Sequence, residues 1–127
     1  MHISITMKLK EIVDCIEDIA PLAYQESYDN AGLICGDVNM EIKGALICLD
    51  STEEVIEEAI NEGCNLVIAH HPIVFSGLKK FNGKTYIERV IMTAIKNEIA
   101  IYVAHTNLDN VKNGVNAKFA EKLGLTN

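Results

Sequence analysis

The stretch GALICLDSTEEVIEEAINEGCNLVIAHHP, residues 44–72, holds two apolar runs separated by one amphipathic segment. Residues 44–49 and 65–69 are continuous apolar runs bounded by turn formers, which is typical of strands buried on both faces. The segment between them begins with a capping-box sequence at residues 51–54, and its apolar side chains share one helical face until Gly63. This order of strand, helix and strand predicts a parallel pair joined by a right-handed crossover.

The same pattern continues on both sides of this unit. Residues 8–20 and 86–98 carry apolar side chains at helical spacing, so each segment is predicted to form a helix. Residues 99–104 form another continuous apolar run and predict a further strand, while residues 32–35 predict a short strand after a loop. The closing residues 116–123 are predicted to form a short helix.

The composition fits one folded unit. The chain has 127 residues, of which 49% are hydrophobic and 23% charged, enough to bury a core. We therefore predict a single α/β domain over residues 1–127, with a small, mostly parallel sheet flanked by helices. Residues 1–6 precede a second methionine at position 7, and we interpret them as an added or poorly ordered extension in which His2 has no role.

Charge and cysteine usage exclude several classes of protein. Eleven basic against 18 acidic residues give a formal charge of −7, which makes nucleic acid an unlikely ligand. No signal peptide and no apolar run near the ~20 residues of a membrane span are found, so we expect a cytoplasmic protein without a membrane partner. The four cysteines form no C-x-x-C motif and are expected to be small buried hydrophobes, at positions 15, 35, 48 and 64.

Three histidines follow two of the predicted strands. His70 and His71 come directly after residues 65–69, and His105 comes after residues 99–104. The carboxyl ends of parallel strands meet at one edge of a sheet, where ligands commonly bind. Because adjacent side chains on a strand point to opposite faces, His70 and His71 would share one ion only if the backbone turned there. Otherwise they could each ligate one of two neighbouring ions.

A carboxylate follows the third histidine. Asp109 lies four residues after His105, a spacing that brings the two side chains together if this segment coils. Imidazole and carboxylate are ligands of zinc, manganese and iron(II), and two such ions ~3.5–4 Å apart can acidify a bridging water. Such a water could attack a phosphoryl group or an amidine-like carbon. The alternative is that Asp109 only forms a turn with Asn110.

Four blocks in the same order carry a resemblance over nearly the whole chain. The blocks are YDNAGL at 28–33, GALICLDSTEEVIEEA at 44–59, AHHPIVF at 69–75 and AHTNLD at 104–109. They resemble the dinuclear-metal family of GTP cyclohydrolase I type 2 homologues, also called Nif-three-like proteins. A GTP ring-opening activity is attached to that name. The members are ring-shaped hexamers, which implies a homo-oligomer here.

The resemblance also implies roles for individual residues. His70, His71 and Asp109 would be metal ligands for zinc, iron or manganese, with as many as two ions per site. His105 would lie in or beside the site, either as a ligand or as a catalytic residue that orients a ligand or carries a proton. Asp29 to Gly32 could line the pocket, although a turn explains this segment well. Asp50 could face the pocket or cap a helix.

Two departures from the family pattern concern the site. Tyr28 stands where the family usually has a tryptophan. Family members are about twice as long and complete the site with a His and a Glu from a late segment, whereas this sequence has no histidine after His105. We therefore expect an incomplete site, either because the sequence is an N-terminal fragment or because water or another subunit fills the remaining positions.

These observations lead to two functional hypotheses. The first is a metal-dependent hydrolase of the cyclohydrolase or phosphoester type, acting on a small molecule such as a nucleotide. The second is a catalytically inactive metal-binding or protein-interaction module that forms a ring-shaped assembly. Metal content and activity against nucleotides distinguish the two.

Overall fold

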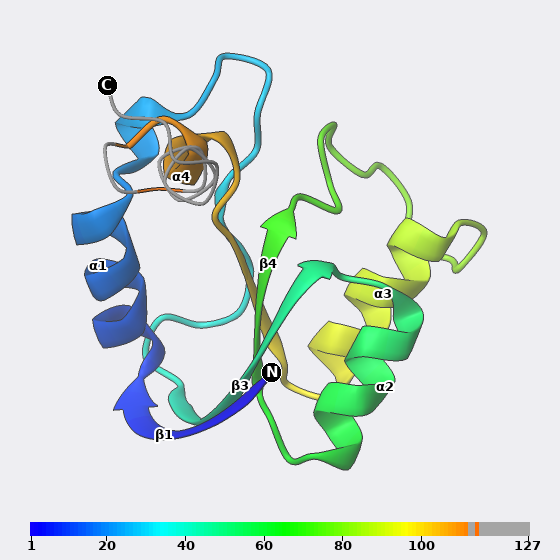
Figure 1. Cartoon of the computed structure of the whole chain (residues 1–127). Coiled ribbons are helices and arrows are strands. Elements are labelled where there is room, and N and C mark those ends of the chain that lie inside the picture. Colours follow the sequence, from blue (N-terminus) through cyan, green and yellow to red (C-terminus); the bar gives the residue numbers. More distant parts are fainter. Residues whose placement is uncertain (112–113, 115–127) are drawn as a thin grey trace.

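The computed structural model describes residues 1–111 and residue 114, so the helix predicted at 116–123 lies outside the described residues. In this part of the chain a central sheet has five strands in the order β1-β3-β4-β5-β2 (Figure 1). The strands are β1 (His2–Lys8), β2 (Gly32–Cys35), β3 (Glu41–Asp50), β4 (Leu66–His71) and β5 (Ala100–Val103).

Parallel pairing is confined to the centre of the sheet. β3 pairs with β4 and β4 with β5 in parallel, and each pair is connected by a crossover helix. The two edge strands instead run antiparallel, β1 against β3 and β2 against β5. The predicted α/β class with helices flanking the sheet is confirmed, but the sheet is mixed, because antiparallel strands complete both edges.

The second methionine suggested that residues 1–6 are an added or poorly ordered extension. The structure instead places them in the sheet. They begin the edge strand β1, in which His2 lies opposite Leu46 and Ser4 opposite Gly44. The amino group of Met1 donates a hydrogen bond of 3.0 Å to the carbonyl oxygen of Ile47. The alternation of polar and apolar residues in HISITM is the period-two pattern of a strand, and this local signal could have revealed β1.

Helices cover both faces of the sheet (Figure 1). α2 (Glu53–Asn61) and α3 (Tyr86–Lys96) lie on one face, and α1 (Leu9–Ile19) lies on the other. The short helices η1 (Leu22–Tyr24) and α4 (Thr106–Asp109) contact each other. In the described part of the chain, no helix is long and apolar enough to cross a membrane.

Each face of the sheet has its own core. Val67 and Ile101 pack with the residues of α2 and α3, while Leu66 and Tyr102 pack with those of α1. Adjacent strand residues thus enter different cores, since side chains alternate across a sheet. The continuous apolar runs in the sequence predicted this two-sided burial, and they leave polar side chains to gather where the strands end.

Two local predictions were wrong. The N-cap of α2 is Thr52, whose hydroxyl accepts a hydrogen bond of 3.2 Å from the backbone N–H of Val55, and not Ser51 as the capping-box pattern suggested. Cys15 is exposed on α1 and is not a buried hydrophobe. Cys64 is buried as predicted, while Cys35 and Cys48 are half-buried.

Candidate metal centre

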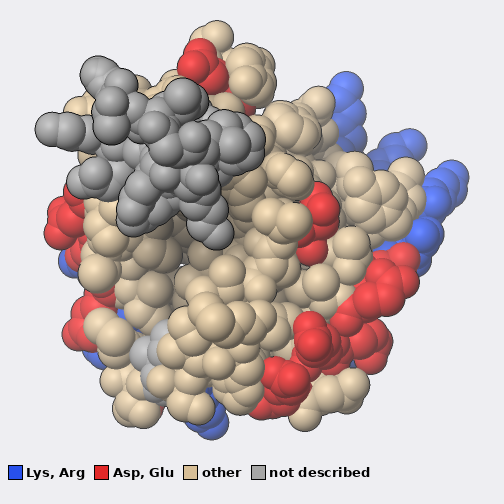
Figure 2. Space-filling view, viewed as in Figure 1, with Lys and Arg blue, Asp and Glu red and all other residues tan. Residues whose placement is uncertain are grey.

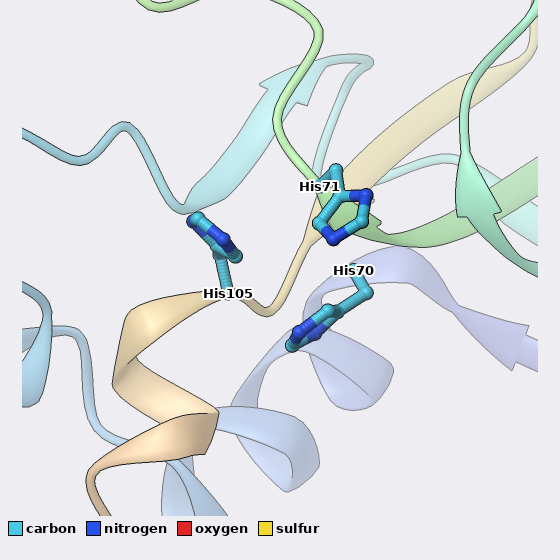
Figure 3. A group of neighbouring side chains, drawn as sticks. All are labelled: His70, His71 and His105. Carbon is cyan, nitrogen blue, oxygen red and sulfur yellow. The ribbon is translucent and has the colours of Figure 1, made fainter. Parts of the chain in front are cut away.

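The three predicted histidines meet at one edge of the sheet (Figure 3). The ring centroid of His70 lies 5.1 Å from that of His71 and 5.3 Å from that of His105, and the third separation is 5.6 Å. One ring nitrogen of each histidine lies within 4.8 Å of the others. The parallel neighbours β4 and β5 end side by side, which explains how residues far apart in sequence converge.

The adjacent histidines also converge, although they belong to the same strand. His70 and His71 are the last two residues of β4, yet one ring nitrogen of each lies within 4.8 Å of the other and of a ring nitrogen of His105. Figure 3 shows their rings directed toward the same space as the ring of His105. The side chains of His70 and His71 can therefore bind the same metal ion. The backbone does not force them to bind separate ions.

Each imidazole is oriented by a hydrogen bond at Nδ1. The partner of His70 is the carbonyl oxygen of Ala104 at 2.8 Å, that of His71 is Asp50 Oδ1 at 2.9 Å, and that of His105 is Asp29 Oδ1 at 3.1 Å. A carbonyl or carboxylate oxygen can only accept, so each Nδ1 carries the proton. This tautomer leaves the lone pair on Nε2, where no hydrogen-bond donor is found among residues 1–111, and metal-ligating histidines are usually oriented in this way.

Asp109 supplies a carboxylate near this group. Residues 106–109 coil into α4, and the backbone N–H of Asp109 donates to the carbonyl oxygen of His105 at 3.1 Å, so the turn on which the predicted pairing of His105 and Asp109 depended is present. The carboxylate oxygen Oδ1 lies 3.7 Å from Nε2 of His70. The structure thus places Asp109 beside His70, at the same edge as the three imidazoles.

Asp29 has a larger role than the turn that the sequence suggested. Its side chain is fully buried and accepts hydrogen bonds from His105 and from both the backbone and the hydroxyl of Thr106. Burial alone would raise the pKa of this carboxyl group, but the hydrogen bonds outweigh burial and lower the pKa below its ordinary value of 3.8. Asp29 is therefore an ionised group that holds His105 in place.

Asn107 was not singled out in the sequence, yet it fixes the turn at His105. Its side chain is 0% exposed. The side-chain oxygen accepts from the N–H of His105 at 2.9 Å, and the amide nitrogen donates to the carbonyl oxygen of Ala20 at 2.9 Å. The TN pair within AHTNLD was the available signal. Asn107 ties the strand end that carries His105 to the end of α1.

Figure 2 shows acidic and basic side chains on several parts of the surface, including the outer side of α2 and the loop after β4. Exposed glutamates cover the outer side of α2, as the helical pattern predicted. Exposed lysines project from the loop that leaves β4 directly after His71, at positions 79, 80 and 84. The start of this loop is anchored by Asn30, whose side-chain amide donates to the carbonyl oxygen of Val74 at 2.6 Å.

Three imidazoles with fixed tautomers and a nearby carboxylate, at the carboxyl edge of an α/β sheet, define a protein with the ligand set for a divalent transition metal. Comparison with known proteins identifies the family of the chain. Residues 7–127 match the family model of Duf34/NIF3 (NGG1p interacting factor 3), and the chain belongs to that family. The resemblance inferred from the four sequence blocks is confirmed.

Two curated relatives carry the same name. The chain is 46% identical over 119 residues to the "GTP cyclohydrolase 1 type 2 homolog" of Clostridium perfringens and 41% identical over 120 residues to that of Clostridium acetobutylicum. The matches cover 94% of this chain but 45% of each relative. The chain therefore spans less than half the length of these relatives.

Solved structures show the same fold. A Bacillus cereus protein related to NIF3 superposes with a TM-score of 0.88 at 44% identity, over 98% of this chain and 34% of the other. Reduced HcgD from Methanocaldococcus jannaschii gives a TM-score of 0.88 at 39% identity, over 98% of this chain and 50% of the other. The fold seen here is therefore one part of these longer proteins.

Proposed function

We propose that this chain carries the histidine-rich part of a metal-dependent hydrolase site. His70, His71 and Asp109 would hold the metal, and His105 would act as the catalytic residue. The observation that carries this proposal is the set of three imidazoles whose Nδ1 atoms are bonded to acceptors while their Nε2 atoms remain available. Isolated structural histidines rarely share such an arrangement, because it leaves each acceptor nitrogen without a protein donor.

The donors suit zinc, manganese or iron(II). Neutral imidazole and carboxylate are common ligands for all three, and the carboxylate of Asp109 could bridge two ions. A divalent cation held there would supply Lewis acidity, lowering the pKa of a bound water toward neutrality. The proposal is a dinuclear centre, with its remaining ligands supplied by residues outside the described part of the chain, by another subunit or by water.

His105 differs from the other two histidines in the group that accepts its Nδ1 hydrogen bond. Its Nδ1 donates to a buried carboxylate, whereas Asp50, the partner of His71, has a side chain that is 62% exposed. A carboxylate acceptor at Nδ1 leaves Nε2 as the ring nitrogen that can accept a proton. His105 can thus take a proton from the attacking water and return it to the leaving group, while Asp29 keeps the ring in the correct tautomer.

A nucleotide is the substrate class that best fits the proposal. The curated relatives are named as homologues of a GTP cyclohydrolase, a name that implies hydrolytic opening of a ring of GTP. The lysine-bearing loop after His71 would attract the phosphates of such a substrate, and its positive charge contrasts with the acidic surface of α2. A water activated by the metal could also hydrolyse a phosphoester bond of the same substrate.

A catalytically inactive module is the competing proposal, because a set of metal ligands can also serve binding or assembly without a reaction. It could bind metal and assemble with other copies into a ring without catalysing a reaction. Homo-oligomerisation belongs to both proposals, because a second subunit could complete the site.

Metal content and hydrolysis measured on the same samples test the proposal. The metal-loaded chain should hydrolyse GTP or an aryl phosphoester. His105→Gln should keep the metal content and lower the rate by about 10²–10⁴-fold. The control is Arg89→Gln, an exposed residue paired with Glu53 on α2 at 3.0 Å, which should change neither quantity.

Each outcome decides between the two proposals. Loss of metal in His105→Gln would make this residue a ligand and would contradict its role as proton carrier. An unchanged rate in the same variant would remove His105 from the reaction. Full metal occupancy without any hydrolysis in the unmodified chain would support the inactive module.

A further inference from the structure

A second group of metal-ligating side chains lies at the opposite edge of the sheet. It consists of His2 in β1, Glu62 at the C-terminal end of α2 and Cys64 just before β4. One ligand atom of each lies within 4.8 Å of the others. We propose that these three residues form a separate binding site for a divalent ion of the zinc type.

The backbone makes room for an ion between these side chains. Gly44 lies in β3 directly beneath them, and a Cβ atom at this position would come within 3.1 Å of His2 Nε2 and 3.2 Å of Cys64 Sγ. The imidazole and the thiol therefore converge over a glycine that lacks a side chain. A larger residue at position 44 would press against both the imidazole ring and the thiol and would change how they lie.

The geometry needs only a small adjustment for coordination. Ligand atoms around tetrahedral zinc are about 3.3–3.8 Å apart, given bond lengths of about 2.0–2.3 Å. His2 Nδ1 and Glu62 Oε2 are already 3.3 Å apart. Their side chains are 38% and 40% exposed, so they can move toward the buried Cys64, and water can reach the remaining coordination position.

The local charge also favours a cation. Burial raises the pKa of the Cys64 thiol, and the neighbouring carboxylates of Glu62 and Glu58 raise it further. A field that disfavours a bare thiolate favours a bound divalent cation, which neutralises the thiolate and the carboxylate together. Binding would displace the thiol proton to solvent as the metal–sulfur bond forms, so no oxidant or reductant is required.

This site is independent of the histidine centre. Cys64 precedes the first residue of β4, whereas His70 and His71 are its last two residues, so the two groups lie at opposite ends of this strand. His2 also precedes residues 7–127, which match the family model. A metal bound here would link the edge strand β1 to α2 and β4, and it would serve to hold the strand in place.

Cobalt titration tests the site, because a thiolate ligand gives Co²⁺ a near-ultraviolet charge-transfer band that imidazole and carboxylate ligands do not give. The full chain, kept reduced with a non-thiol reductant, should develop this band with one equivalent of Co²⁺. Cys64→Ser should abolish the band, and the matched control Cys15→Ser, at an exposed cysteine of α1, should retain it.

Further variants separate the two sites and guard against misfolding. His2→Ala and Glu62→Gln, both at exposed positions, should each weaken Co²⁺ binding at this site by at least about 10-fold. The double variant His70→Ala/His71→Ala should keep the band. The proposal is overturned if no band develops with the unmodified chain, if the band survives in Cys64→Ser, or if His2→Ala binds Co²⁺ as tightly as the unmodified chain.

Discussion

The two ends of the sheet differ in how their histidines are held. At the carboxyl end, His70, His71 and His105 each have an Nδ1 partner from a different segment of the chain. At the amino end, His2 has one contact of 3.3 Å to the half-exposed Glu62. The first group is ordered before any ligand arrives, whereas the second would be ordered by the ion itself. Substitution of residues that orient a ligand should therefore lower metal affinity mainly at the carboxyl end.

The largest effect is expected from the double variant His70→Ala/His71→Ala. Removal of two ligands should weaken zinc or manganese binding at the carboxyl end by more than ~100-fold, beyond the loss caused by a supporting residue. Isothermal titration calorimetry with each metal measures this change. Thermal unfolding of the metal-free protein is the control for folding. Unchanged affinity in a folded double variant would remove both histidines from the proposed centre.

Asp29→Asn should have the next largest effect. The amide retains one acceptor but cannot accept all the hydrogen bonds from His105 and Thr106. We expect hydrolysis to fall by about 10–100-fold. The free energy of unfolding should fall by about 1–3 kcal/mol, because buried donors lose their partner. Steady-state rates and urea denaturation check the two quantities.

The pH dependence of stability identifies the charge of Asp29 as the cause. The pKa of this group is lowered in the folded protein, so its ionised form stabilises the fold above the ordinary value of 3.8. That contribution is lost as the pH falls through the lower folded-state pKa. The stability difference between the unmodified chain and Asp29→Asn should therefore shrink below a pH of about 3.8. A difference independent of pH would point to packing instead.

Asp50→Asn sharpens the comparison within the carboxyl end. Asp50 also supports a histidine, but its side chain is 62% exposed, and water can replace the lost charge. We expect metal affinity to fall by no more than about 10-fold, which is the smallest effect typical of residues that orient a metal ligand. The free energy of unfolding should change little. A loss as large as that of Asp29→Asn would show that burial of the supporting carboxylate does not determine its effect.

The smallest effect is expected for His2→Ala in the absence of metal. The exposed contact between His2 and Glu62 should contribute at most about 1 kcal/mol to the free energy of unfolding. Chemical denaturation in the presence of a chelator measures this value. With Zn²⁺ at 100 times its dissociation constant, the unmodified chain should gain about 2.7 kcal/mol from a single site. His2→Ala should lose the stabilisation that Zn²⁺ gives through the site at the amino end. If Zn²⁺ stabilises His2→Ala as much as the unmodified chain, the proposed difference between the two ends is wrong.

Local patterns in the sequence were sufficient for much of the fold. The apolar runs at residues 44–49 and 65–69 predicted β3 and β4, and helical spacing predicted α1, α2 and α3. The positions of His70 and His105 after predicted strands indicated that their side chains would lie close together, and their ring centroids are 5.3 Å apart. These inferences succeeded because hydrophobic periodicity and strand ends are properties of short segments.

Only the tertiary structure determined how distant segments meet. It paired β1 antiparallel with β3 and so brought His2 over Gly44, near Cys64. It also placed Asp29 against His105, 76 residues away along the chain. The sequence alone determined most of the elements, with β1 as an exception, and the candidate ligands. Their hydrogen-bond partners depended on which buried donors and acceptors the folded chain brings together, and no local pattern encodes that choice.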